Sequence, residues 1–538
     1  MRDVVLNPTQ RMINGLTRLR ESVGVTLGPK GQNVLLQPEI GNSTHTKDGV
    51  TVALHFDDDD QVALMAARTV ITAAREMASK VGDGTTSVII LATELSERLL
   101  LLPPNLRRGV INELNILYDA ACARIEAKSI PIEATIESLL PVATLACNHQ
   151  YDLAKLVAET VTAVGANGAV SFQQSPRGDG KHEANVTSGL HFDRGAVHAA
   201  FFTDPNAIGT WRQEDCAVFC YNGTLSEARE LIPILDGAAS SKKNTLIIAS
   251  DIVGSALATA VSNHRASSYP HSVVAVKAPK MGQRRLDMLT DIAIITGGTV
   301  YDPGVHGDLA NRDSGQEMHN WLGTAELVSV NAASTSISSS AGVASEIDRI
   351  VVELKELALR VDQIERSHIE DRIAKLVGGV GTILVGGRND AEVKASMFLV
   401  EDGISACFAA LRKGVIPAGG LAYKWSLQLG RAYNPDSVVK VHAKEIFCAV
   451  MEAPLKRLIS NAMESGSPGT VTYSLITDML NEDDDVGYNV LTDEMEDFRM
   501  TFMVEPTILA VEALRTSLGC GSILGSTAAA IVKPSPGK

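Results

Sequence analysis

The chain has 538 residues, with 63 acidic and 48 basic side chains and a formal net charge of -15. Contacts to nucleic acid or to an anionic membrane surface need clustered Lys and Arg, so this balance argues against both kinds of partner. A chain of this length exceeds one ordinary core, so we expect about two to four domains. No apolar run is expected to span a membrane.

The cysteines give no sign of a disulfide framework or of structural zinc. Seven are scattered through the chain, and the closest pair is Cys216 and Cys220. No second pair and no histidine stand at ligand spacing, so reduced, buried thiols in a cytoplasmic protein are expected. The N-terminal residues show neither a signal-peptide nor a transit-peptide pattern, which agrees with that location.

The first third is predominantly helical. Apolar residues at helical spacing predict a helix from Thr9 to Val25, which ends before Gly28 and Pro29. The stretches NVLLQ and GVTVAL are typical of strands that flank a polar turn, STHTKDG. Two long helices are then predicted, at 61–80 and 86–102.

The centre has a different character. NTLIIAS and HSVVAVKAP are short apolar runs, each followed by a helical pattern, which predicts βαβ units and a parallel sheet. Residues 343–376 form a charged stretch with apolar steps of three and four, typical of a coiled coil or a helical hairpin. Beyond Gly378 the Ala-rich helical style returns, so we expect a discontinuous domain with a central module inserted into it.

The stretch VGDGTTS, residues 81–87, combines a carboxylate, free backbone and hydroxyl donors just before an apolar helix. Glycines allow backbone N–H groups to approach a ligand, and the helix N-terminus favours an anion. Asp83 would repel a bare phosphate, but it fits a divalent cation held between carboxylate and phosphate. This predicts a nucleotide-phosphate site with a metal. The alternative is a common helix N-cap after a glycine turn, and the stretch lacks the ending of a Walker loop.

Further stretches carry a family resemblance. TLGPKG, TKDG and PAGG are glycine-containing polar turns between apolar elements, and GLHFDRG, VEDGISA and MEAPLKRLI occur in the same order and with similar spacing. With them the chain resembles the bacterial-type (group I) chaperonins, the GroEL-like family, over nearly its whole length. Its departures from the family pattern suggest a divergent lineage.

The resemblance implies an α+β multidomain fold with three domains. A helical equatorial domain for ATP binding and ring contacts is expected at 1–128 and 414–538. A small intermediate hinge domain is expected at 129–187 and 380–413. An α/β apical domain for polypeptide binding is expected at 188–379.

The resemblance also implies a set of nucleotide-binding residues. Lys47 would approach phosphate, Asp83 would hold Mg²⁺, and residues 84–87 would cradle phosphate oxygens. Asn489 would face the base, and Glu505 stands where the family has an Asp that contacts ribose. The full set is Thr26, Leu27, Gly28, Pro29, Lys47, Asp83, Gly84, Thr85, Thr86, Ser87, Gly419, Gly420, Asn489 and Glu505.

Two further acids match the family residues that promote hydrolysis, Asp48 and Asp402. A carboxylate that polarises water for in-line attack fits the chemistry of phosphoryl transfer. Asp402 belongs to the intermediate segment and would reach the site as the hinge closes. Outside the family context, a solvated helix acid would be the preferred interpretation of Asp402. ATP and Mg²⁺ are the expected cofactors, and K⁺ is an open addition.

Five apolar residues match the family's polypeptide-binding positions: Phe201, Ile232, Leu235, Leu257 and Val261. Ile232 and Leu235 are three apart and Leu257 and Val261 four apart, so each pair shares a helix face. From spacing alone, core packing explains these positions equally well. Smaller residues stand at the neighbouring positions Ala196, Ala200 and Ser262, which predicts a shallower groove.

The resemblance therefore implies an ATP-driven folding machine that binds non-native polypeptides. The alternative is a non-enzymatic ring that holds its clients with an impaired ATP cycle. A seven-membered homo-oligomeric ring is expected, single or double, with a co-chaperonin lid left open, in the cytoplasm (the host cell's, if the gene is viral). Weak ring–ring contact is suggested because Lys456 replaces an Arg and Ser465 replaces a partner Glu of the family.

Overall fold

The computed structural model describes residues 3–37, 44–166, 168–175, 180–202, 210–265, 272–311, 318–340, 342–361, 363–463, 468–501 and 503–532. The described chain divides into two compact units. The first unit comprises Met1–Ala158, Pro176–Lys181 and Gly386–Lys538, and the second comprises Glu159–Ser175 and His182–Val385. The second unit is thus inserted into the sequence of the first.

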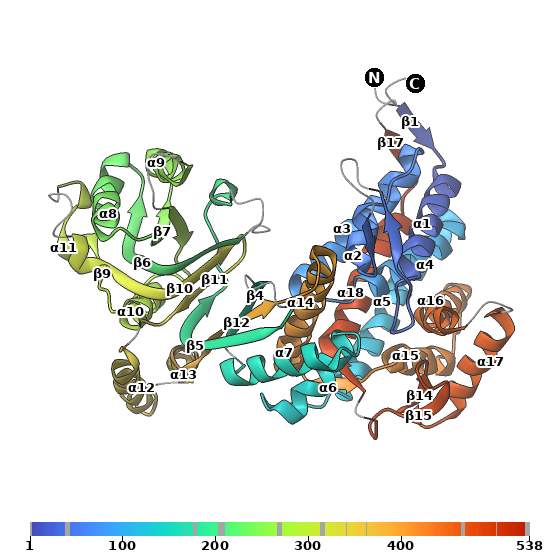
Figure 1. The fold of residues 1–538 in the computed structure, drawn as a ribbon. Helices are drawn as coiled ribbons and strands as arrows, with labels where there is room; N and C mark the ends of the chain where they lie inside the picture. The colour runs from blue at the N-terminus through green and yellow to red at the C-terminus, as the bar shows by residue number, and fades with distance from the viewer. Residues whose placement is uncertain are drawn as a thin grey trace. The chain divides into compact units, whose positions relative to one another are not determined.

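The first unit is built on packed helices (Figure 1). Its helices are α1 (Thr9–Gly24), α2 (Gly49–Leu54), α3 (Gln61–Val81), α4 (Thr85–Leu101), α5 (Pro104–Ala127), α6 (Ile136–Ala146), α14 (Asp390–Lys413), α15 (Leu421–Ala432), α16 (Val438–Ala462), α17 (Pro468–Asn481) and α18 (Thr507–Gly525). Helix α7 (Tyr151–Val164) leads into the second unit. The predicted helices in the first third are confirmed within one or two residues.

Helix α18 packs against α4 in the core of the first unit. Its length and composition alone would allow it to cross a membrane, contrary to the sequence expectation. Much of the helix is nevertheless buried against neighbouring helices, with Ala510, Leu514 and Leu518 among its core residues. Its apolar character therefore has an explanation in core packing.

Short ladders join distant parts of the first unit. Strand β1 (Asp3–Leu6) pairs antiparallel with β17 (Ala529–Val532), so segments near the two chain ends lie side by side (Figure 1). The other ladders are β2 (Val34–Leu36) with β3 (Thr44–Thr46), β13 (Val415–Pro417) with β16 (Val504–Pro506), and β14 (Val486–Asn489) with β15 (Glu494–Asp497). The last two ladders lead into the cavity described below.

Residues 49–54 correct the sequence prediction, because GVTVAL forms α2 and not a strand. Asp48 is the N-cap of this helix, and its carboxylate accepts hydrogen bonds from the backbone N–H groups of Val50 and Thr51. The capped N-terminus and packing against α1 outweigh the β-propensity of the valines and the threonine.

In the second unit, nine described strands form one sheet, in the order β4-β12-β5-β11-β10-β6-β7-β8 with β9 beside β6. They are β4 (Ala169–Gln174), β5 (Glu183–Phe192), β6 (Thr210–Leu225), β7 (Thr245–Ile252), β8 (Val273–Lys277), β9 (Val300–Tyr301), β10 (Gly323–Asn331), β11 (Thr335–Ser338) and β12 (Gly379–Val385). Strands β7 and β8 are parallel, as predicted, and β6 is parallel to β7. The pairs β5–β11, β11–β10 and β10–β6 are antiparallel.

The helices of the second unit are α8 (Ala228–Ser241), α9 (Gly254–Arg265), α10 (Gln283–Thr296), α11 (Pro303–His306), α12 (Ala344–Ala358) and α13 (Gln363–Val377), with short 3-10 turns at Ala199–Phe201, Leu309–Asn311 and Met318–Trp321. Helices α8 to α11 each follow a parallel strand, whereas α12 and α13 follow the antiparallel strand β11. Helices α12 and α13 pack on each other, so the helical-hairpin alternative is the one observed. Ile347, Val351 and Leu354 bury one face of α12 in the unit's core.

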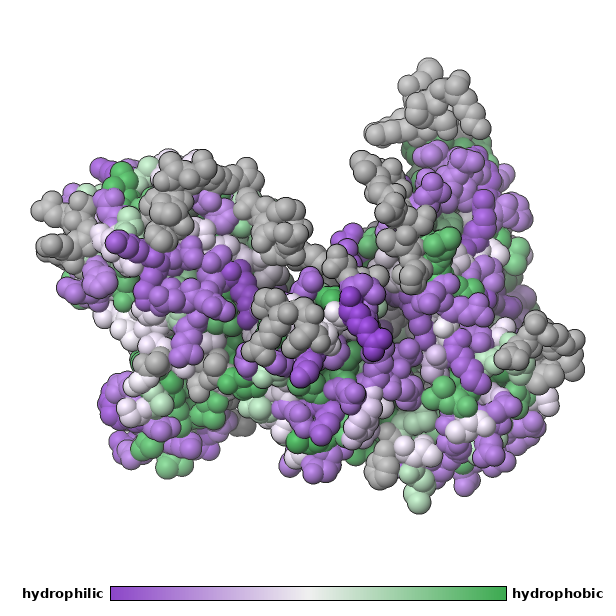
Figure 2. All heavy atoms as spheres, in the orientation of Figure 1, coloured by the Kyte–Doolittle hydropathy of each residue, from purple (hydrophilic) through white to green (hydrophobic). Residues whose placement is uncertain are grey.

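On the face drawn in Figure 2, hydrophilic residues cover much of the described surface, and apolar residues interrupt them in patches. Singly exposed apolar residues are normal on soluble proteins and do not by themselves indicate a binding surface.

Candidate functional site

A cavity of about 1040 Å³ lies within the first unit. Its walls come from segments far apart in the sequence: the loop after α1, the start of α2, the α3–α4 turn, α14, and the β13–β16 and β14–β15 ladders. The structure brings together here all the residues predicted to bind nucleotide or promote hydrolysis: Thr26, Leu27, Gly28, Pro29, Lys47, Asp48, Asp83, Gly84, Thr85, Thr86, Ser87, Asp402, Gly419, Gly420, Asn489 and Glu505.

Two helices begin at the cavity wall with a glycine N-cap. Gly84 precedes α4 with φ 88°, and Gly420 precedes α15 with φ 80°. Both angles lie in the left-handed region that favours glycine. Among the described residues no side chain caps either helix. The first backbone N–H groups of α4 therefore remain available for an anion, and the helix dipole favours one. At the start of α15, the N–H groups of Leu421 and Tyr423 already donate to the carbonyls of Ala418 and Gly420.

Asp48 is fixed in the cavity wall by the helix that it caps. Its carboxylate accepts from Val50 N at 3.1 Å and from Thr51 N at 2.9 Å, and Thr51 Oγ1 donates to it at 2.5 Å. Such a carboxylate is held in one orientation by its donors. The capping role and the predicted role in hydrolysis are compatible, because a carboxylate oxygen can accept more than one hydrogen bond.

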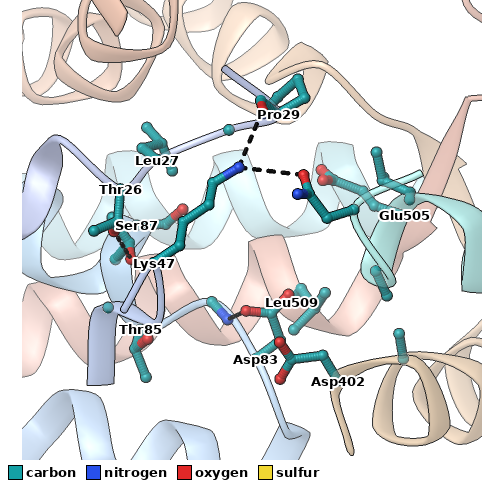
Figure 3. Close-up of a pocket in the computed structure, with 18 of the residues that line it drawn as sticks. Thr26, Leu27, Pro29, Lys47, Asp83, Thr85, Ser87, Asp402, Glu505 and Leu509 are labelled. Carbon is teal, nitrogen blue, oxygen red and sulfur yellow. Dashed lines mark hydrogen bonds between the residues drawn. The ribbon is translucent and has the colours of Figure 1, made fainter. Parts of the chain in front are cut away.

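Asp83 and Asp402 point toward one another (Figure 3). The N–H of Gly84 donates to Asp83 Oδ1 at 2.5 Å, while burial and then Asp48 raise the pKa of Asp83. Burial also raises the pKa of Asp402 well above its usual range, with further contributions from Asp83, Asp48 and Glu401. Like charges in a partly buried setting disfavour ionisation, and a bound cation would reverse that effect.

The donor set fits Mg²⁺ in one specific way. In the described chain no group of three or more His, Cys, Asp or Glu residues is arranged to hold a metal ion. Mg²⁺ is commonly bound by one or two carboxylates together with substrate phosphates and water. Asp83, beside the phosphate-suited N-terminus of α4, matches that mode.

Lys47 extends across the cavity (Figure 3). Its Nζ donates to Pro29 O at 3.0 Å and to Asn148 Oδ1 at 3.2 Å, and burial lowers its pKa. The neighbouring His149 also has a lowered pKa, through burial and then Lys47. Asn148 and His149, with φ 50° and 61°, line the cavity but were not predicted. Asn tolerates the left-handed region, and this was a weak signal for a turn.

Asn489 and Glu505 lie on two of the short ladders. The side chain of Asn489 is buried, its Nδ2 donates to Glu496 Oε2 at 2.9 Å, and its Oδ1 accepts from Leu491 N at 3.0 Å. Glu505 pairs with Ile416 in the β13–β16 ladder. Burial and then Asp83 raise the pKa of Glu505 to about 8.

The predicted polypeptide-binding residues belong to the second unit and differ in exposure. Phe201 is 1% exposed and packs edge-on against His264, with ring centroids 5.4 Å apart. Leu235 is 9% exposed, whereas Ile232 on the same helix is 49% exposed. Leu257 and Val261 on α9 are partly buried against the core. As they stand, Phe201 and Leu235 serve the core, and Ile232 is the member open to a ligand.

Residues at the predicted ring–ring contact are described only in part. Lys456 pairs with Glu452, one turn earlier on α16, at 2.8 Å. Ser465 lies outside the described residues.

Comparison with known proteins agrees with this architecture. The TCP-1/cpn60 chaperonin family matches residues 19–521. The fold is similar to that of the chaperonin gp146 from the bacteriophage EL 2 (Pseudomonas aeruginosa), crystallised in the presence of ATP-BeFx. In crystal form II the TM-score is 0.71 at 20% identity, and 99% of each chain is covered. In crystal form I the TM-score is 0.65 at 19% identity, with the same coverage.

The predicted α+β multidomain chaperonin fold is therefore confirmed, in a sequence that has diverged far from the phage protein. The family match spans nearly the whole described chain and includes the segments that line the cavity. This chain belongs to the TCP-1/cpn60 chaperonin family.

Proposed function

We propose that this protein is an ATP-dependent ring chaperonin that binds non-native polypeptides and assists their folding through Mg²⁺-dependent ATP hydrolysis. One observation carries the proposal: the predicted residues, from seven stretches of sequence, line a single cavity of about 1040 Å³. Membership of the chaperonin family and the ATP analogue present with the phage chaperonin support the same reading. We place the activity in the cytoplasm.

The chain's own groups divide the work. Backbone N–H groups at the start of α4 and the hydroxyls of Thr85, Thr86 and Ser87 would receive phosphate oxygens. Asp83 would hold Mg²⁺, which neutralises charge on the phosphates when bound. Asn489 would face the base and Glu505 the ribose.

Asp48 and Asp402 are the candidates for orienting the attacking water. Asp48 is held by its hydrogen bonds at the start of α2, and Asp402 comes from α14 and points toward Asp83 (Figure 3). A carboxylate beside the phosphates can accept a proton from water as it attacks. Ionisation of Asp402 depends on the cation, because burial and the neighbouring acids raise its pKa.

Polypeptide binding belongs to α8 and α9 in this proposal. These helices pack together, and Ile232 presents an exposed apolar side chain on α8. Val253, just before α9, is also exposed, at 41%. Non-native chains expose apolar side chains, so an apolar contact here is chemically suited to them.

The test is an ATPase and refolding assay on the purified protein. We expect phosphate release with Mg²⁺ and ATP, its loss when EDTA is added, and improved recovery of a chemically denatured client only when ATP is hydrolysed. Suppression of client aggregation without phosphate release would instead support the non-enzymatic holding ring. Absence of both phosphate release and suppression of aggregation would contradict both candidate functions.

A further inference from the structure

Lys424 is a fully buried lysine on α15, four residues after Gly420. In the described chain its Nζ donates to three backbone carbonyl oxygens: those of Glu482 at 3.4 Å, Asp483 at 2.6 Å and Val486 at 2.7 Å. An ammonium has three N–H donors and no acceptor, so three carbonyl oxygens can accept from all of its donors. A buried cation needs such partners because removal from water disfavours its charge, and burial lowers the pKa of Lys424.

The three carbonyls belong to the acidic segment, residues 482–486, which connects α17 to β14. The next residue on α15, Trp425, holds the same segment through a hydrogen bond from Nε1 to Asp484 O at 2.7 Å. Lys128 adds an ion pair to the Asp484 carboxylate at 2.9 Å and lies 4.7 Å from the centroid of the Trp425 ring. Two consecutive side chains of α15 thus fix the backbone of the acidic segment.

This contact joins two walls of the cavity. Gly420 is the N-cap of α15, and β14 runs from Val486 to Asn489; both Gly420 and Asn489 line the cavity. The Asn489 amide is already oriented by Glu496 and by Leu491 N. The position of the β14 backbone therefore determines where the Asn489 amide can form further hydrogen bonds in the cavity.

We propose that Lys424 is a positioning residue for the base-facing wall of the cavity, acting through the acidic segment and β14 on Asn489; the inference rests on the proposed function. Removal of the ammonium takes one hydrogen bond from each of the three carbonyls and leaves that of Asp483 with the N–H of Val486, at 3.0 Å. The acidic segment must then shift to satisfy the lost hydrogen bonds. The shift displaces Asn489 and weakens base recognition. Hydrolysis at saturating ATP is spared, because Asp48 and Asp402 lie on other helices.

Lys424→Met tests this, because it keeps an unbranched side chain and removes the donors. We expect Kd for MgATP and KM to rise about tenfold while kcat stays within about twofold, and the preference for ATP over GTP to shrink. Lys444→Met is the matched control. Lys444 Nζ also donates to backbone carbonyls, of Arg431 at 2.9 Å and Tyr433 at 2.7 Å, but these stand at the end of α15 and not in the segment that leads into β14. Its loss should leave Kd and base preference unchanged, even if the Tm falls.

A second measurement needs no nucleotide. Hydrogen exchange at the backbone amides of 486–491 should accelerate in Lys424→Met and stay unchanged in Lys444→Met. If Lys424→Met does not fold, Trp425→Phe tests the inference in its place. It removes one donor to the acidic segment and should also raise the Kd for MgATP, by a smaller factor. Unchanged Kd and unchanged exchange in the folded variant would overturn the inference. Absence of nucleotide binding by the unmodified chain would instead overturn the proposed function.

Discussion

The cavity of the first unit and the α8–α9 face of the second were both predicted residue by residue, but the structure treats the two sets differently. The polar and glycine residues of the cavity all line it. On the α8–α9 face, Ile232 is exposed while Phe201 and Leu235 are buried. The two sets differ in outcome because polar and glycine residues carry different information from apolar residues, and not because one set matches the family less well.

A buried carboxylate has few purely structural uses, so its position in a motif is informative, and a glycine beside it adds to the signal. Asp83 is disfavoured as a charged group by its own surroundings, and Gly84 has a backbone that other residues rarely adopt. An apolar residue has an ordinary use in every core. Helical spacing places Leu235 and Ile232 on a shared face, but it does not say which of them meets the sheet and which meets solvent.

The sharpest test of the cavity is Asp402→Ala. Loss of a positioned general base should lower kcat by about 10²-fold or more, while nucleotide binding persists. Steady-state phosphate release and equilibrium binding of a fluorescent ATP analogue measure the two effects separately. Asp436→Ala is the control, since Asp436 pairs with Lys440 on the surface and does not line the cavity. Equal loss of turnover in both variants would remove the special role of Asp402.

On the α8–α9 face, two serine substitutions separate core from contact. Ile232→Ser should lower client affinity by about tenfold with little change in Tm, because an exposed apolar side chain gains its burial only from the client. Leu235→Ser should instead lower the Tm, because it leaves a cavity and a hydroxyl in the core. Suppression of client aggregation and thermal unfolding report the two properties. Val305→Ser is the matched control, since Val305 is exposed on α11; client binding that falls equally in it would deny the face any specificity.

Glu505 offers a pH test of the cavity. Its pKa in the fold, about 8, lies above its ordinary value of 4.5, so the folded chain keeps a proton that the unfolded chain releases between these values. Glu505 therefore makes the free energy of unfolding fall as pH rises from about 4.5 to about 8. Glu505→Gln removes this dependence, and its stability relative to the unmodified chain should rise across that window by up to about 5 kcal/mol.

Thermal unfolding without nucleotide, at pH 5 and pH 9, measures the Glu505 effect. The exposed Glu494 on β15 provides the control substitution, Glu494→Gln, which should leave the pH profile unchanged. A profile for Glu505→Gln that parallels the unmodified chain would mean that Glu505 is ionised in the fold at neutral pH.

The smallest expected effect concerns ring–ring contact. Lys456 is paired with Glu452 on its own helix, so it has less reason to reach a facing ring. Exposed ion pairs contribute about 0.2–1 kcal/mol each, and the loss is repeated around a ring. We expect native mass spectrometry to find single rings, or double rings that separate with ATP. Double rings that persist at high salt in every nucleotide state would refute this.

The sequence by itself determined the chemistry of the cavity and the family. Its polar turns carry residues whose types suit phosphate, cation and base, and their order along the chain matched one family. It also determined the long helices and the parallel strands β7 and β8, because their apolar periodicity is local. These features depend on neighbours in sequence, and a single chain contains that information.

Tertiary structure decided what depends on distant partners. GVTVAL became a helix because the Asp48 cap and packing on α1 outweighed strand propensity. Burial separated Leu235 from Ile232 once α8 had docked on its sheet. Lys424 received a function only when carbonyls about sixty residues further along, between Glu482 and Val486, closed around its ammonium. A buried charge is stable only where folding brings enough partners to it, and those partners are remote in sequence.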